Sequence, residues 1–203
     1  MKVALIGATG HVGSRLLAEL SARGHVVTAI VRQPDKVPAG GKVTAVKGEV
    51  FDGDGLARLL AGHDVVISAV HFSASDPGTL IGAVKASGVP RYIVVGGAGS
   101  LEVAPGLKLI DTPQFPAAYL DEARKGADFL DLLKAEPALN WAFLSPSALI
   151  QPGERTGRFR LGIDQLLVDD AGNSAISTED YAIALVDELE TPRHERRRFT
   201  VGY

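Results

Sequence analysis

The feature that most constrains the fold of this chain is a cluster of glycines near its start, in Gly7-Ala8-Thr9-Gly10-His11-Val12-Gly13. The cluster follows residues 2–6, a short β-branched and aliphatic run typical of a strand buried on both faces. It leads into residues 12–23, where apolar side chains recur at helical spacing. A strand that turns through glycines into a helix is the start of a βαβ unit, whose strands run parallel.

The same alternation of strand and helix patterns continues along most of the chain. Further strands are predicted at residues 26–31, 43–46, 65–69, 92–95, 141–144 and 199–201, and further helices at residues 55–60, 80–86, 119–134 and 178–190. This order predicts an α/β fold with a doubly wound parallel sheet of the Rossmann type, in a single domain over residues 1–203.

Two stretches interrupt the alternation. Residues 151–173 are rich in glycine and charge, and we expect them to form small additions on the substrate side, with short strands at 158–161 and 166–168. Residues 101–118 contain Pro105, Pro113 and Pro116 and predict a long irregular loop. Because this loop follows the strand at 92–95 at the carboxyl edge of the sheet, where ligands of this fold bind, we expect it to form a lid or wall over the acceptor pocket.

Composition argues against several classes of protein. The formal net charge is −3, whereas a polyanion-binding domain carries a clear basic excess, and the basic run at 193–198 lies beside acidic residues, so we expect no nucleic-acid partner. The chain has no cysteine and its five histidines lack metal-ligand spacing, which predicts neither disulfide nor metal site. No apolar run approaches the ~18 residues of a membrane span, so we expect a soluble, cytoplasmic protein without a membrane partner.

The glycine cluster also has the spacing of a turn that holds a dinucleotide. In such a turn the first glycine permits the sharp bend, the second lets the backbone approach a pyrophosphate, and the third lets the helix pack close to the sheet. The start of the helix presents free N–H groups and a partial positive charge to the phosphates. We therefore predict that the whole turn binds a nicotinamide dinucleotide, through Gly7, Ala8, Thr9, Gly10, His11, Val12 and Gly13.

The end of the second predicted strand indicates which dinucleotide is bound. Folds that prefer NAD place an acid there for the ribose 2′-hydroxyl, whereas an arginine accommodates a 2′-phosphate. This strand ends at Arg32, and the first acid after it is Asp35. Because a guanidinium can pair with a phosphate through two hydrogen bonds, the sequence predicts NADP as cofactor, with NADPH preferred over NADH. Arg15, in the first helix, is either a second cation for the phosphate or part of a solvated helix face.

The glycine turn, with Val31-Arg32 and Gly48-Glu49-Val50, resembles the atypical short-chain dehydrogenase/reductases. Residues 94–101, 144–147, 152–157 and 177–182 are similar to the small NAD(P)H-binding proteins often called NADH-flavin reductases, so the resemblance covers nearly the whole chain. The chain more distantly resembles NmrA-like regulators and biliverdin/flavin reductase B.

The resemblance implies further cofactor contacts where three predicted strands end. It implies that Gly48, Glu49 and Val50 edge the adenine site, that Ala69 and Val70 line the cofactor, and that Ser145 and Pro146 lie near the nicotinamide. The alternative for each of these positions is plain packing at a strand end.

The chain lacks the catalytic pair of typical short-chain dehydrogenases. These enzymes place a lysine four residues after a tyrosine on one helix, where it lowers the pKa of the tyrosine. The nearest match is Tyr119, but Ala123 stands four residues on, and Lys125 points away because it lies about 600° round the helix. Ordinary carbonyl or alcohol dehydrogenase activity is therefore not expected.

Hydride transfer to a flavin does not need a tyrosine–lysine pair, because the cofactors carry out the chemistry themselves. The protein can accelerate the transfer by orienting the two rings. We predict an NAD(P)H-dependent oxidoreductase that reduces a flavin or similar planar small molecule, contacted by Tyr119 and Ser100. Tyr119 is alternatively an aromatic packed under a loop, and Ser100 a turn residue. Two other functions stay open: an NmrA-like protein that senses NADP(H) without turnover, and an epimerase or isomerase acting on a nucleotide-linked substrate.

Overall fold

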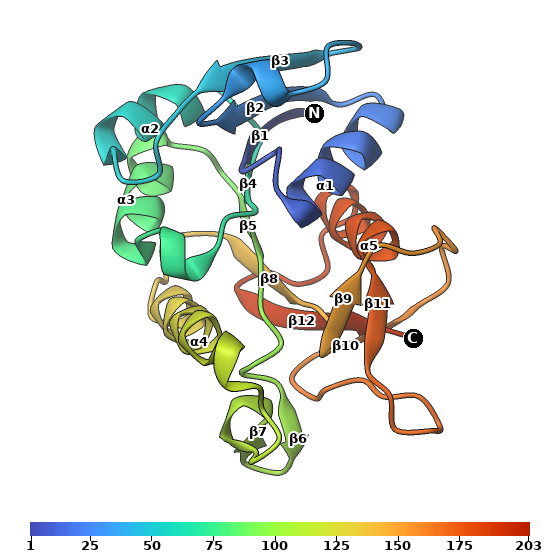
Figure 1. Ribbon diagram of the computed structural model, residues 1–203. Coiled ribbons are helices and arrows are strands. Elements are labelled where there is room, and N and C mark those ends of the chain that lie inside the picture. Colours follow the sequence, from blue (N-terminus) through green and yellow to red (C-terminus); the bar gives the residue numbers. More distant parts are fainter.

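The computed structural model describes residues 1–203 and is built around one eight-stranded sheet (Figure 1). Across the sheet the strands are β10 (Arg160–Gly162), β12 (Arg197–Gly202), β8 (Trp141–Ser145), β5 (Tyr92–Val95), β4 (Val65–Ser68), β1 (Lys2–Ile6), β2 (Val26–Val31) and β3 (Val43–Lys47). All neighbours pair in parallel except β10, which is antiparallel to β12. The chain winds outward from β1 to β3 and then returns to the other side of β1, which confirms the predicted doubly wound Rossmann fold.

Helices cover both faces of this sheet. On one face α1 (His11–Ala22) packs beside α5 (Thr178–Glu190), and the other face carries α2 (Gly53–Leu60), α3 (Pro77–Ser87) and α4 (Leu120–Lys134) (Figure 1). Two apolar cores result, one around Leu16 and Leu185 and the other around Leu80 and Trp141. Because both faces are covered, the central strands are apolar throughout, which is why their sequence pattern was continuous rather than alternating. The helices are all too short or too polar to span a lipid bilayer.

Local sequence signals set the ends of the helices. The carboxylate of Asp76 accepts the N–H of Thr79 at the start of α3, and the hydroxyl of Ser177 accepts the N–H of Asp180 at the start of α5. Both are N-caps, which satisfy a backbone donor that the helix itself leaves free. α3 ends at Gly88, whose φ of 71° is the left-handed conformation that glycine adopts without strain.

The predicted loop at 101–118 contains more regular structure than its prolines indicated. It begins with a small hairpin of β6 (Glu102–Ala104) and β7 (Leu107–Lys108), and then forms two 3-10 turns at Leu109–Asp111 and Ala117–Tyr119. The second turn ends at Tyr119, so α4 starts one residue later than predicted.

The segment after β8 also differs from its prediction. β10 lies within two residues of the strand predicted at 158–161, but 166–168 is not a strand. Instead the N–H of Leu166 donates to the carbonyl of Glu102, so this segment braces the hairpin. Two unpredicted strands, β9 (Leu149–Gln151) and β11 (Ala175–Ser177), pair in parallel beside the sheet. Each has three residues, too few for a period to be recognised in the sequence.

Candidate functional site

The turn from β1 into α1 has the close packing that its glycines predict. Gly7 has a φ of 83°, and a β-carbon there would collide with the carbonyl oxygen of Ala69, just after β4. A β-carbon on Gly13 would collide with the carbonyl of Gly7. At Gly10 a β-carbon would lie 3.3 Å from the same carbonyl. Gly7 and Gly13 are therefore required by the fold itself, whereas the role predicted for Gly10 depends on the ligand.

Helix α1 begins without a side-chain cap. Gly10 occupies the N-cap position and its neighbours supply no side-chain acceptor. The first bond of the helix runs from the N–H of Ser14 to the carbonyl of Gly10, so the amides of His11, Val12 and Gly13 have no acceptor in the chain. α1 also has no acidic residue in its first turn. These unsatisfied donors and the positive end of the helix dipole favour an anion at this point.

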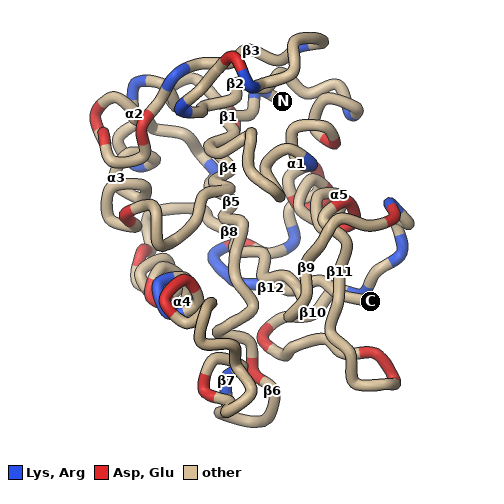
Figure 2. Tube along the Cα trace, in the orientation of Figure 1, with Lys and Arg blue, Asp and Glu red and all other residues tan.

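The residues predicted around the adenine and ribose lie next to this turn. The N–H of Gly7 donates to the carbonyl of Ile30, two residues before Arg32, and the N–H of Gly48 donates to Val31. The side chain of Arg32 is exposed and makes none of the salt bridges of the chain. Figure 2 shows several Lys and Arg positions around the β2–β3 end of the sheet. Backbone hydrogen bonds therefore join the carboxyl ends of β1, β2 and β3.

The other predicted contacts on this side of the sheet are close-packed. A β-carbon at Gly48 would lie 2.5 Å from the Ile30 side chain, so the strand end has no room for a larger residue. Glu49 is exposed, whereas Val50 packs against the core under α2. Ala69 and Val70 are half-buried after β4, and the N–H of Ala69 donates to Ile6.

The residues predicted near the nicotinamide lie further along the sheet, at the end of β8. Ser145 and Pro146 are buried, and the hydroxyl of Ser145 has no hydrogen-bond partner. The backbone of this strand end is well fixed, because Tyr181 donates to the carbonyl of Leu144 at 2.6 Å and Thr200 to that of Ser145 at 2.9 Å. Burial raises the pKa of Tyr181, which keeps its hydroxyl a proton donor.

Tyr119 projects from the start of α4, with 65% of its surface exposed. The position that a catalytic lysine would take is filled by Ala123, which packs so closely on Gly99 that a β-carbon on that glycine would lie 2.8 Å from the alanine methyl. Lys125 pairs instead with Asp121 at 3.0 Å. The close packing of α4 on Gly99 therefore accounts for alanine at the position where a tyrosine–lysine pair would have its lysine. Contact between Tyr119 and an acceptor stays a prediction.

The other residue predicted to contact the acceptor, Ser100, is buried in an ionic cluster. Its hydroxyl and its carbonyl both accept from Nη1 of Arg198 at 2.9 Å, and Arg198 also pairs with Asp164. This arrangement ties the start of the 101–118 segment to β12. The geometry gives Ser100 a structural part, and a contact from Ser100 to an acceptor stays a prediction.

The loop between β4 and α3 is held by a residue that sequence reasoning missed. The carboxylate of Glu122, in the first turn of α4, accepts the N–H groups of Phe72 and Ser73, both at 2.8 Å. The ring of Phe72 enters a hole left by Gly126, where a β-carbon would lie 2.9 Å from the ring, and it stacks on Phe143. An acid early in a helix is common, so no local signal marked Glu122 as a clamp on a distant loop.

Charged side chains join α1 to α5 and to the segment after β9. Arg15 donates to Glu179 at 3.1 Å, so its side chain is part of the ionic contact between α1 and α5 and is not a free cation. Glu179 also accepts the N–H of Gly153 at 2.9 Å, and Arg155 bonds Glu19 on α1. The glycine- and charge-rich segment after β9 is therefore held against α1 by these bonds. Helix α1 follows the turn at residues 7–13, which we call the phosphate turn after the ligand predicted for it.

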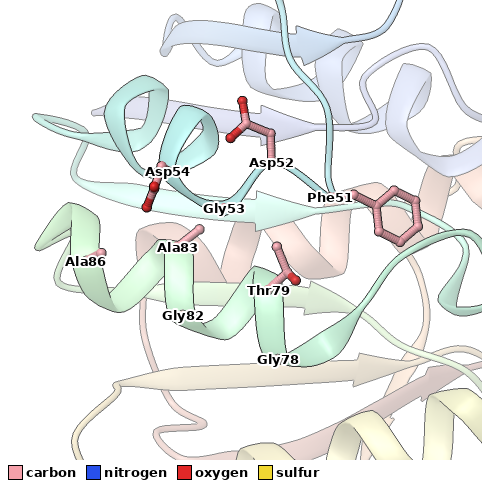
Figure 3. A pocket seen from close by; sticks show the side chains of 9 residues that line it. All are labelled: Phe51, Asp52, Gly53, Asp54, Gly78, Thr79, Gly82, Ala83 and Ala86. Carbon is pink, nitrogen blue, oxygen red and sulfur yellow. The ribbon is translucent and has the colours of Figure 1, made fainter.

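A separate groove of about 400 Å³ runs between α2 and α3 (Figure 3). Small residues of α3, among them Gly78, Thr79 and Gly82, line one wall, and Asp52 and Phe51 line the other. Phe51 directly follows Val50 and 65% of its surface is exposed. The residues that line the groove come from 51–54 and from α3, and none of them belongs to the turn at Gly7–Gly13.

Comparison with known proteins agrees with this geometry. A structure from Bacteroides thetaiotaomicron, described as a candidate epimerase, is 45% identical, covers 100% of this chain and 96% of its own, and superposes with a TM-score of 0.95. A candidate exported protein from Burkholderia pseudomallei is 47% identical over 100% of both chains, with a TM-score of 0.90. A candidate NADH-flavin reductase from Streptococcus pneumoniae is 38% identical over 100% of this chain and 99% of its own, with a TM-score of 0.85.

The model of a family described as NAD(P)H-binding matches residues 7–192, which starts at the first glycine of the turn and ends just after α5. With its parallel sheet and uncapped first helix, this chain belongs to the NAD(P)H-binding family whose model it matches.

Proposed function

We propose that this protein uses NADPH to reduce a flavin or a similar planar acceptor. The observation that carries the proposal is the cradle between β1 and α1, where the amides of His11, Val12 and Gly13 have no acceptor and two glycines have no room for a side chain. A pyrophosphate is a suitable acceptor for these donors. The residues present therefore fit a dinucleotide, whose reduced nicotinamide supplies a hydride when bound.

Arg32 supports the choice of NADPH. Its guanidinium is exposed at the end of β2 and has no ionic partner, so it is available to a ribose 2′-phosphate. Gly48, Glu49, Val50, Ala69 and Val70 would border the adenosine half, and Ser145 and Pro146 the nicotinamide half.

Two features support a planar acceptor that needs no tyrosine–lysine pair. Ala123 fills the position of the lysine, and the exposed ring of Tyr119 offers a flat apolar surface at the carboxyl edge of the sheet. The relative from Streptococcus pneumoniae, a candidate NADH-flavin reductase that matches over the whole chain, agrees with this choice.

The test has a binding step and a turnover step. Titration with NADPH and NADH, followed by the fluorescence of the dihydronicotinamide, should show tighter binding of NADPH. Stopped-flow mixing of the protein, NADPH and free flavin should bleach the flavin faster than the uncatalysed reaction. Equal affinity for both dinucleotides refutes the NADPH preference. Tight NADPH binding with no oxidation by any acceptor favours instead an NmrA-like sensor of the NADP(H) state.

A second candidate is epimerisation or isomerisation of a nucleotide-linked substrate, which the description of the Bacteroides relative favours. Such a reaction needs a proton-transfer pair, and Tyr119 has no lysine beside it. Incubation of the protein and NADP⁺ with nucleotide sugars, followed by NMR of the sugar carbons, would reveal an epimer if this function were the correct one.

A further inference from the structure

The loop that leaves β4 carries a histidine paired with a fixed carboxylate, and the proposed flavin reduction makes no use of the pair. Nδ1 of His71 lies 3.3 Å from Oε1 of Glu122. The imidazole is accessible to a ligand, because 83% of the His71 side chain is exposed. From the sequence alone, a histidine in this position is most simply a solvated loop residue, and only the structure shows its partner on α4.

The carboxylate of this pair is held rigidly. Glu122 accepts the N–H groups of Phe72 and Ser73 as well as the imidazole, and Phe72 is anchored in the core. Burial raises the pKa of Glu122, but the bonds from Ser73 and Phe72 and the neighbouring His71 outweigh burial and lower it. Glu122 therefore stays ionised at neutral pH. An ionised carboxylate that bonds Nδ1 fixes the ring and leaves Nε2 free for a ligand.

The pair lies at the edge of the sheet where the acceptor is expected. The loop begins at Ala69, whose carbonyl is in contact with the phosphate turn at Gly7. His71 follows two residues later. Glu122 lies about one helical turn beyond Tyr119, on the same end of α4. The pair thus joins the loop that leaves β4 beside the phosphate turn to the end of α4 that carries Tyr119, at the carboxyl edge that binds ligands in this fold.

We propose that His71 is a catalytic acid and Glu122 its positioning residue, and that the site accepts carbonyl-type acceptors, such as quinones, whose reduced oxygen must receive a proton. This inference rests on the proposed function, because it requires a bound reduced nicotinamide. It assigns to His71 the task that a tyrosine–lysine pair performs in typical short-chain dehydrogenases.

When bound, the reduced nicotinamide would supply a hydride, with two electrons, and would itself become the oxidised pyridinium. Addition of the hydride to one quinone oxygen leaves a negative charge on the other. The quinone oxygen, now an oxyanion, takes the proton from Nε2 of His71 and becomes a hydroquinone. The neutral imidazole, still bonded to Glu122 through Nδ1, regains its proton from water.

A flavin does not have the same need, because its reduced ring can hold the added charge as a delocalised anion and take a proton later from water. Replacement of His71 should therefore affect the two acceptor classes unequally. General acid catalysis contributes roughly 10²–10⁴-fold, so in His71→Gln the ratio of quinone to flavin reduction should fall by about 10²-fold or more. Because His71 is exposed, this variant should keep the thermal stability of the wild type.

The experiment measures NADPH oxidation with benzoquinone and with free flavin for the wild type, His71→Gln, Glu122→Gln and Asp121→Asn. Asp121 is the matched control, since it is an exposed acid next to Glu122 that pairs with Lys125. The control should keep the wild-type ratio, and Glu122→Gln should lower it. An unchanged ratio in His71→Gln, or an equal loss with both acceptors, overturns the proposal. A wild type that reduces flavin but not quinone overturns it while the proposed function stands, whereas a wild type that reduces neither refutes both.

Nitrogen NMR gives a second readout that does not depend on turnover. With ¹⁵N-labelled histidine and NADP⁺ bound, the hydroquinone product should shift the Nε2 resonance of His71 and leave Nδ1 nearly unchanged. Glu122→Gln should release the ring, so that both nitrogens respond. No shift at Nε2 on addition of hydroquinone overturns the assignment of His71 as the acid.

Discussion

At the residue scale, the phosphate turn requires glycine at positions 7 and 13, where any side chain would collide with the backbone. In Gly13→Ala the new methyl group would collide with the carbonyl of Gly7. Overpacking of this kind costs about 1–3 kcal/mol, and the displaced helix start should also weaken NADPH binding. Urea unfolding and an NADPH titration measure the two effects. The control is Gly82→Ala, where no atom lies within 4 Å of the added carbon. Loss of stability in the control but not in Gly13→Ala would contradict this account.

Also at the residue scale, Arg32 should discriminate between the two dinucleotides. A hydrogen bond to a charged group contributes about 1.5–3 kcal/mol, so Arg32→Ala should weaken NADPH binding by roughly 10- to 100-fold and leave NADH binding nearly unchanged. Paired fluorescence titrations check this. Arg197 is a matched control, because it is exposed and stands at the opposite end of the sheet, where β12 begins. A parallel loss for both dinucleotides in Arg32→Ala would show that the arginine does not read the phosphate.

The residues that could be predicted from the sequence are those whose role is local. The spacing of Gly7, Gly10 and Gly13 is set by one turn of backbone, and Arg32 by its place at a strand end, so a single stretch of sequence contains the whole argument. Glu122 and Ser100 differ, because the partners that define them lie 50 and 98 residues away. No spacing along the chain indicates such pairs, and this is why the clamp and the ionic cluster emerged only in the structure.

At the scale of elements, the segment 101–118 begins with a hairpin that backbone hydrogen bonds fasten at both of its ends. The N–H of Glu102 donates to Asp164, and the N–H of Ile110 donates to Gly99. Its two short strands are mostly exposed. If the segment walls the acceptor pocket, replacing residues 103–107 by a short glycine linker should lower turnover several-fold and leave NADPH affinity within about two-fold of wild type. Steady-state kinetics and titration separate the two, and weaker NADPH binding with normal turnover would exclude a role as a wall.

Prediction of elements succeeded where an apolar run extends over a whole strand, or a helical period over a whole helix. β1, β2, β5 and α5 have the predicted bounds, because buried runs and a clear N-cap mark them. It failed for β9 and β11 and for residues 166–168, where three-residue segments take their form from distant pairing partners. Edge additions of this kind owe their structure to the sheet beside them, not to their own propensity.

At the scale of the whole molecule, ion pairs between α1 and α5 join the half of the chain that forms the phosphate turn to the half that follows β8. Glu19 is central, since its side chain is only 7% exposed and bonds both Arg23 and Arg155. Burial raises the pKa of Glu19, but the bonds from Arg155 and Arg23 outweigh burial and lower it. A carboxyl whose pKa is lower in the folded state stabilises the fold above its unfolded pKa of about 4.3, and the stabilisation is lost as the pH falls through the folded pKa.

Glu19→Gln should therefore destabilise the protein in a pH-dependent manner. Removal of one partner from a buried charged network costs about 3 kcal/mol, so the free energy of unfolding should be lower than wild type by about that amount at pH 7. The difference should shrink toward pH 3, because the wild-type carboxyl then becomes protonated and loses the same bonds. Urea unfolding at both pH values measures this, with Glu154→Gln as the control, an exposed acid that makes no salt bridge. If Glu19→Gln lowered the free energy of unfolding equally at pH 7 and pH 3, Glu19 would stabilise the contacts of α1 by packing and not by its charge.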